Sequence, residues 1–295
     1  MEETQQPGLI STSPPGPGQK STALAVTVFL LAAFAIIVPS ARVMLRPLDV
    51  YIPLVAVVMF LTDLMTATLL LAQFSIVRSR ALLLLASGYL FTALLVATYG
   101  LVWPLVIHPT GLFDAGPQTA PWLYLIWHAG LPTSVILYGF LKSKEHKTQP
   151  VTRDSVGKFI LASIMCAVLL VFGLSWLVIR FQHILPVLMT PTGQASEFSS
   201  FGTGAVFLVS VSAFVLQWRR RQRSVLDLWL SIVLLAWLLG SITLNILGGR
   251  FTVGWYATPR LRYHIGNPCL TDPSFRIADV TRAPCRIRFG AAART

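Results

Sequence analysis

The sequence predicts an all-α bundle of seven membrane-spanning helices, a polytopic membrane fold, and three observations support this fold class. Hydrophobic residues make up 55% of the 295 residues and charged residues only 12%, whereas soluble domains carry about 25% charged residues. The apolar residues fall into runs of about 20, the length that a helix needs to cross a bilayer. The Lys and Arg residues lie between these runs, as loop charges do in membrane proteins.

The predicted spans are separated by links that are polar or rich in Pro and Gly. Residues 1–20 carry two Glu and four Pro, which is unlike a secretory signal peptide, and we expect them to form a disordered cytoplasmic N-terminus. The spans that follow are residues 21–40, 54–77, 81–103, 121–141, 159–179, 201–218 and 225–247.

The orientation follows from the Lys and Arg residues of alternate links. The links on one side, including the N-terminal segment, hold twelve of them, and the links on the other side hold four. Basic loops stay in the cytoplasm, so the N-terminus is expected inside and, after seven spans, residues 257–295 outside. The basic residues thus lie in the links and in residues 257–295, and not on one folded face. No folded basic surface is predicted, and we expect no nucleic acid as a partner.

Residues 257–295 differ in composition from everything before them. They contain seven Arg, no Lys, four Pro and no apolar run long enough to span a membrane. An aberrant basic tail of this kind is what an out-of-frame reading of a GC-rich gene tends to give. We therefore expect the authentic chain to stop near Ala257, the remainder being a frameshift product; the alternative is a disordered extension.

Two ionisable side chains lie deep inside predicted spans. Burial of such a group in a bilayer costs free energy, so its presence indicates a role in function or in packing. Asp63 is the tenth residue of the second span and His128 the eighth of the fourth, which places them at depths of roughly 15 and 12 Å. Both spans run in the same direction, so the two side chains can pair if the helices adjoin. Such a pair can sense a ligand, an ion or a proton. The alternative is an interhelical hydrogen bond that only fixes packing.

Aromatic residues surround His128 in the sequence. Trp122, Tyr124 and Trp127 lie at the outer end of the fourth span. One interpretation is an interfacial anchor, since Trp and Tyr prefer the headgroup level. The other is that they line an apolar ligand site together with His108 and Gln118 from the preceding loop. Taken alone, His108 is typical of a solvated loop residue.

The sequence contains no recognisable catalytic or metal-binding motif. It has no phosphate-binding Gly loop, no HExxH motif and no nucleophile elbow. Its three cysteines have no metal-ligand spacing, and their odd number argues against a disulfide framework. We expect no enzyme activity, no cofactor and no metal. The rival function is a small transporter or channel with Asp63 as the coupling acid, although no inverted repeat is clear.

Several stretches together resemble a known family. They are Leu61-Thr62-Asp63, the run from Leu69 to Leu95, HPTGLF from His108, Gln118, WLYLIWHAGLP from Trp122, and Gly254-Trp255-Tyr256. In combination they resemble the fourth type of bacterial membrane-associated sensor domain, over roughly residues 21–256. The chain has Tyr99 where that family tends to have a His, which weakens a histidine-based metal site.

The resemblance implies a function and a missing part. The family is an eight-span sensory module at the N-terminus of sensor histidine kinases of two-component systems and of diguanylate cyclases. We expect this chain to be the input domain of such a protein in the bacterial inner membrane, truncated before the eighth span and the output domain. The expected partners are the lipid bilayer, an unidentified small-molecule or physical stimulus, and a second copy in a homodimer.

Overall fold

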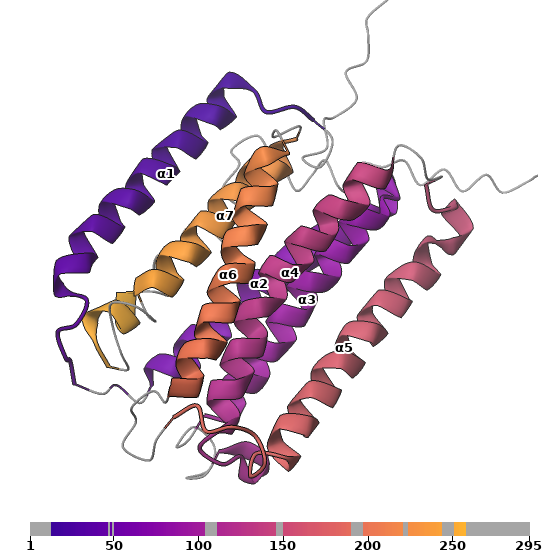
Figure 1. Cartoon of the computed structure of the whole chain (residues 1–295). Helices are drawn as coiled ribbons and strands as arrows, with labels where there is room; N and C mark the ends of the chain where they lie inside the picture. The colour runs from indigo at the N-terminus through magenta and orange to yellow at the C-terminus, as the bar shows by residue number, and fades with distance from the viewer. Residues whose placement is uncertain are drawn as a thin grey trace, which may run out of the picture.

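The computed structural model describes residues 13–46, 48, 50–103, 111–145, 150–189, 197–220, 224–243 and 251–257. Seven helices in this part of the chain are long and apolar enough to cross a membrane, and they stand side by side as one bundle (Figure 1). They are α1 (Pro17–Ile37), α2 (Tyr51–Val77), α3 (Arg80–Leu101), α4 (Thr119–Lys144), α5 (Val156–Arg180), α6 (Glu197–Arg219) and α7 (Val225–Ile242). The predicted all-α polytopic fold is confirmed.

The ends of the helices follow from local chemistry. Helix α1 begins at Pro17, before the predicted start at residue 21, because Pro suits the first helical position and Gln19 Oε1 accepts a hydrogen bond from Gly16 N (3.0 Å). The expected disordered N-terminus therefore ends earlier, and residues 1–12 lie outside the described part. Between α2 and α3, Arg78 adopts a left-handed conformation (φ 58°) and the Ser79 side chain caps α3.

The described residues also form three short 3₁₀ helices, at Val38–Ser40, Leu112–Asp114 and Arg153–Ser155, and a short helical segment at residues 253–257. Helix α7 is described only to Ile242, so the remainder of the predicted seventh span, residues 244–247, lies outside the described part. The predicted basic tail lies outside it as well, apart from residue 257.

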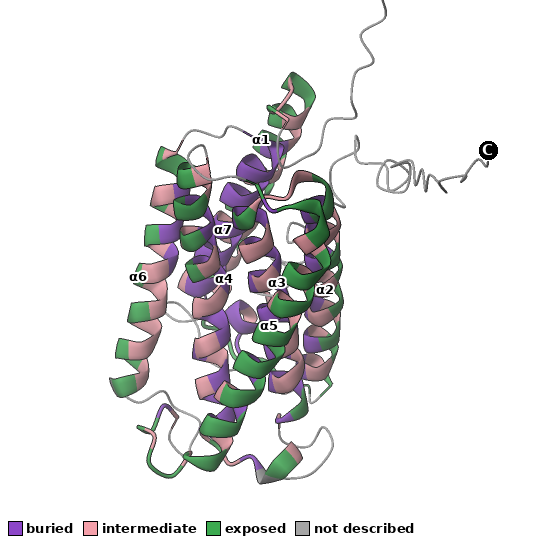
Figure 2. Cartoon of the chain, turned by 90° about the vertical axis from the view of Figure 1, so that its right-hand side faces the viewer, coloured by how far each residue is buried: buried purple, intermediate pink, exposed green. Residues whose placement is uncertain are grey.

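The helices differ greatly in how far the protein covers them. We compare the most apolar 18-residue stretch of each helix. In this stretch, 89% of the residues are buried in α7 and 61% in α3, but only 22% in α5 and 11% in α1 and in α6. Figure 2 shows the same contrast between a largely exposed α5 and a largely buried α7. Helix α7 is therefore the central helix, and the exposed apolar faces of α1, α5 and α6 are available to lipid.

Small residues let the central helices approach one another closely. Gly88 of α3 lies against the Ser134 side chain of α4, and Gly130 of α4 lies against the Phe91 ring of α3. A Cβ added at Gly100 of α3 would lie 2.7 Å from the Ala56 Cβ of α2. Interfaces of small residues are typical of helices that associate in lipid, where van der Waals contact is a major driving force.

The two ends of the bundle differ in charge. The end at the top of Figure 1, here called the basic end, holds the N-terminus of α1 and the link between α6 and α7. Its described basic residues are Lys20, Arg78, Arg80, Lys142, Lys144, Arg153, Lys158, Arg219 and Arg220. The opposite end holds Arg42, Arg46 and Arg180 among the described residues.

At the opposite end, the segment after α7 pairs with the link between α1 and α2. Residues Met44 and Thr252 form an isolated antiparallel bridge, Val253 N donates to Val43 O (2.9 Å), and Gly254 N donates to Ala41 O (3.1 Å). The Tyr51 hydroxyl donates to Tyr256 O (2.6 Å), and the Tyr256 hydroxyl donates to Arg46 O (2.9 Å). The chain that leaves α7 is thus fixed beside the start of α2.

Candidate functional site

A cluster of aromatic rings surrounds His128 in the middle of α4. The His128 side chain is buried, with 4% of the residue exposed. Its ring centroid lies 3.7 Å from that of Tyr124, 4.5 Å from that of Trp127 and 5.3 Å from that of Trp237. We call Tyr124, Trp127, His128 and Trp237 the His128 cluster. Two of the predicted aromatic residues therefore do lie against the predicted histidine.

Helical spacing and one proline build this cluster. Tyr124 lies four residues before His128, which puts both on the same face of α4. Pro132 lies inside the helix and has no N–H to donate to the carbonyl of residue 128. Trp237 Nε1 of α7 donates to that carbonyl instead (3.2 Å). The proline thus frees an acceptor through which α4 binds α7.

The hydrogen bond of the imidazole defines which of its nitrogens carries a hydrogen in the neutral ring. His128 Nδ1 lies 2.9 Å from Tyr124 O, and a carbonyl oxygen can only accept, so Nδ1 carries the hydrogen of this bond. In a neutral ring Nε2 then holds a lone pair. That nitrogen can take a proton, a hydrogen bond or a metal ion. Tyr99 of α3 extends the cluster, its ring 5.8 Å from that of Trp127.

Gln118 and Trp122 make their described polar contacts with the segment after α5. Gln118 Oε1 accepts hydrogen bonds from Leu188 N (2.8 Å) and Met189 N (3.2 Å), and its Nε2 donates to Met189 O (2.7 Å). Trp122 Nε1 donates to Pro186 O (3.2 Å). The two residues fasten the N-terminal end of α4 to this segment.

Asp63 and His108 are the remaining predicted site residues. Asp63 is half-buried on α2, and α3 packs against both α2 and α4. The pairing of Asp63 with His128 stays a prediction. His108 falls in residues 104–110, which lie outside the described part of the chain.

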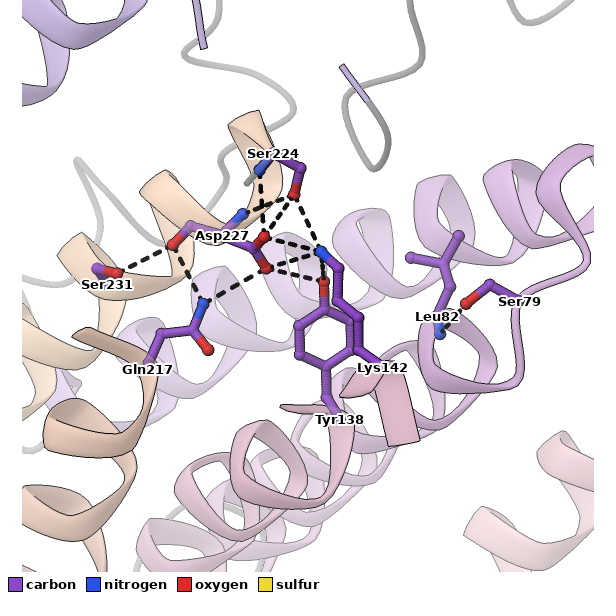
Figure 3. A network of polar contacts seen from close by, with 8 residues as sticks. All are labelled: Ser79, Leu82, Tyr138, Lys142, Gln217, Ser224, Asp227 and Ser231. Atoms are coloured by element: carbon purple, nitrogen blue, oxygen red, sulfur yellow. Dashed lines mark hydrogen bonds and ion pairs between the residues drawn. The ribbon is translucent and has the colours of Figure 1, made fainter. Parts of the chain in front are cut away.

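A second polar cluster lies at the basic end, where α4, α6 and α7 meet (Figure 3). Lys142 Nζ lies 2.9 Å from Asp227 Oδ1 and 2.8 Å from Oδ2, and the Tyr138 hydroxyl donates to Oδ1 (3.0 Å). Ser224 donates to Oδ2 from both its N (3.2 Å) and its Oγ (2.9 Å). Gln217 Nε2 of α6 donates to Asp227 O (3.3 Å). We call these five residues the Asp227 network.

The network gives hydrogen-bond donors to both carboxylate oxygens of its one acid, Asp227. Asp227 is 7% exposed, and its two oxygens accept hydrogen bonds from Tyr138, Lys142 and Ser224, as Figure 3 shows. Burial of a carboxylate costs free energy, and the cost is offset only while its hydrogen-bond donors are all present. The network therefore fixes the relative positions of three helices at the basic end.

Sequence reasoning missed the Asp227 network. Two signals in the sequence point to it. Ser224 and Asp227 have the Ser-x-x-Asp spacing of a capping box before an apolar run, and Tyr138 and Lys142 lie four residues apart on one helix face. In the described part of the chain, no group of three or more His, Cys, Asp or Glu side chains could hold a metal ion.

Comparison with known proteins gives one match. The model of a family described as membrane-associated sensor, integral membrane domain, matches residues 46–269. The match begins after α1 and continues beyond residue 257, whereas the sequence predicts a resemblance over roughly residues 21–256. No curated protein and no solved structure matches the chain.

Proposed function

The chain belongs to the family of membrane-associated sensor, integral membrane domains (MASE4), and from this premise we propose that it receives the stimulus for a bacterial signal-transduction protein. The proposed output is a cytoplasmic kinase or cyclase that responds to a shift in helix packing. The observation that carries the proposal is the His128 cluster, because it places a titratable ring at the contact between α4 and the central helix α7.

We propose that the stimulus is a proton, an ion or a small polar ligand that acts at His128 Nε2. A positive charge on the imidazole would face the rings of Tyr124 and Trp127, which can stabilise a cation through their π-systems. Trp237 of α7 contacts the imidazole ring itself (ring centroids 5.3 Å apart) and also donates to the His128 carbonyl. A stimulus at the imidazole would thus reach α7 directly, while the Asp227 network holds α4 and α7 together at the basic end.

The experiment is a chimera in which the whole chain is followed by the last span and the cyclase of an intact relative. We expect cyclic dinucleotide production to change with pH or with a polar ligand, and we expect His128→Gln to abolish that response. His183→Gln is the matched control, because it makes the same change at an exposed histidine outside the cluster. A His128→Gln chimera that responds normally would contradict the proposal. Solute uptake by the full chain in vesicles would support a transporter or channel instead.

We also propose that the protein lies in the bacterial inner membrane with the basic end in the cytoplasm. The nine described basic residues of that end, against three at the other, support this orientation. A cysteine introduced at Ser13, in a variant without the native cysteines, should resist a membrane-impermeant maleimide added to intact cells, and one at Arg46 should react. The reverse labelling pattern would overturn the orientation.

A further inference from the structure

Arg220 lies at the basic end, directly after the last residue of α6. Its guanidinium lies across α4, 5.1 Å from the centroid of the Phe140 ring. A Cβ added at Gly139 would coincide with one of its nitrogens. The guanidinium can reach this place only because residue 139 has no side chain. Gly139 and Phe140 therefore form a seat for one cation on the surface of α4.

The acid beside Arg220 already has other partners. Asp227 is the neighbouring acid, but both of its oxygens already accept hydrogen bonds from Lys142 and other members of the Asp227 network. Within the described ranges of the chain, no residue forms an ion pair or a hydrogen bond with the Arg220 guanidinium. Two cations thus share one acid, and the donors of the guanidinium remain available.

The Arg220 guanidinium stays charged although it is partly buried. Desolvation lowers the pKa of Arg220 from its ordinary value, while the charge of Asp227 acts in the opposite direction. An arginine stays protonated in proteins because its ordinary pKa lies far above neutral pH. Its planar fork of donors matches two oxygens of one phosphate group.

The surface around Arg220 suits a lipid. Phe140, which lies under the guanidinium, is 50% exposed, and Trp218, two residues before Arg220 at the end of α6, is 63% exposed. Trp is typical of the headgroup level of a membrane. A basic group at this level, beside exposed apolar side chains, meets both the phosphate and the acyl chains of a phospholipid. Basic pockets between helices on the cytoplasmic side bind anionic headgroups in this way.

We propose that the guanidinium of Arg220, seated on Gly139 and Phe140, binds the phosphate of an anionic phospholipid at the basic end of the bundle. The phosphate of the lipid supplies a negative charge to Arg220, because the carboxylate of Asp227 is already bound by Lys142. The network itself stays intact, since Asp227 keeps Lys142 as its partner. The site does not depend on the stimulus or on the output of the protein.

The test is native mass spectrometry of the purified full chain in detergent with added phosphatidylglycerol or phosphatidylcholine. We expect the protein to retain phosphatidylglycerol preferentially. Arg220→Gln should weaken this retention by about tenfold, the usual scale of losing a charge-assisted hydrogen bond. Arg219→Gln is the matched control: it removes the same charge from the adjacent residue, which is exposed. Equal losses in the two variants would indicate a general basic surface and overturn the proposal.

Two further variants and one competitor sharpen the test. Gly139→Ala keeps the charge but fills the seat, and it should weaken retention while the melting temperature stays near that of the parent, because the tip of a flexible side chain can move away. Arg220→Lys should bind less well than the parent, since an ammonium lacks the planar fork. Unchanged retention in Gly139→Ala would contradict the seat. Displacement of phosphatidylglycerol by millimolar inorganic phosphate would indicate a site for free phosphate and overturn the lipid proposal.

Discussion

Helices α4 and α5 show how little hydropathy says about position in this bundle. The most apolar window of α5 has a mean hydropathy of 2.5, yet 22% of it is buried; the window of α4 has a mean hydropathy of 1.2, and 50% of it is buried. A soluble protein would show the opposite order, since water drives apolar helices inward. In a bilayer lipid covers apolar side chains equally well, so polar groups are what a helix must direct toward protein.

Side-chain hydrogen bonds of two kinds occur in the bundle. Hydroxyls in the middle of the spans bond to their own helix, as Ser163 does to Ile160 O on α5 and Thr133 does to Ala129 O on α4. At the basic end, by contrast, Tyr138 and Lys142 of α4 and Gln217 of α6 bind Asp227 of α7. The comparison teaches that α4, α6 and α7 are joined by specific polar contacts at the basic end, whereas the exposed α5 makes no such contact among the described hydrogen bonds of its span.

Removal of the central acid should have the largest effect. Asp227→Ala leaves Lys142 without its partner, leaves Tyr138 without its acceptor and removes half of the capping box of α7. Breaking a buried ion pair from one side usually costs about 3–5 kcal/mol, and we expect the lower part of that range because Lys142 is 30% exposed. The free energy of unfolding in mixed micelles, titrated with SDS, measures this loss.

Asp154→Ala is the control for that measurement. Asp154 is exposed on a short 3₁₀ helix before α5, and its removal should change the free energy of unfolding by less than about 0.5 kcal/mol. Equal losses of unfolding free energy in the two variants would contradict the stabilising role assigned to the Asp227 network.

A methyl group added between α3 and α4 should have the next largest effect. In Gly88→Ala the new Cβ meets the Ser134 side chain, including its Cβ next to the backbone. Overpacking of this kind usually costs about 1–3 kcal/mol. Gly173→Ala on α5 places its methyl where no atom lies within 4 Å, and alanine favours the helix, so this control should be neutral or stabilising by up to about 1 kcal/mol. Thermal unfolding in micelles would show the difference, and a stable Gly88→Ala would refute it.

Loss of the hydrogen bond between α7 and α4 should have the smallest effect. Trp237→Phe keeps an aromatic ring but removes the donor to His128 O, at about 1 kcal/mol. Trp176→Phe is the outer control, since Trp176 is 56% exposed on α5. Pro132→Ala restores a backbone N–H that can donate to the same carbonyl. In that background we expect Trp237→Phe to cost less, and a double-mutant cycle measures the coupling. Strict additivity would contradict the part assigned to Pro132.

Sequence reasoning located the helices well because span length and loop charge depend on local composition. It could not tell that α7 is central and α5 peripheral, since both are equally suited to lipid. For the site, the aromatic residues next to His128 were visible because they are neighbours in sequence. Trp237 was not, because its contact depends on which helices adjoin. The Asp227 network was not predicted for the same reason, although the spacing of Ser224 and Asp227 indicates the capping box that forms part of it.

Helix α1 is held at both of its ends by the segments that flank α7. Near its start Ser13 O accepts a hydrogen bond from Val225 N (3.0 Å), and beyond its end Ala41 O accepts one from Gly254 N (3.1 Å). Its middle is little covered by protein. These two hydrogen bonds link each end of α1 to the chain on either side of α7. We expect a tilt of α1, in a bilayer that thickens or thins, to be passed on through them to α7, the helix whose Trp237 contacts His128.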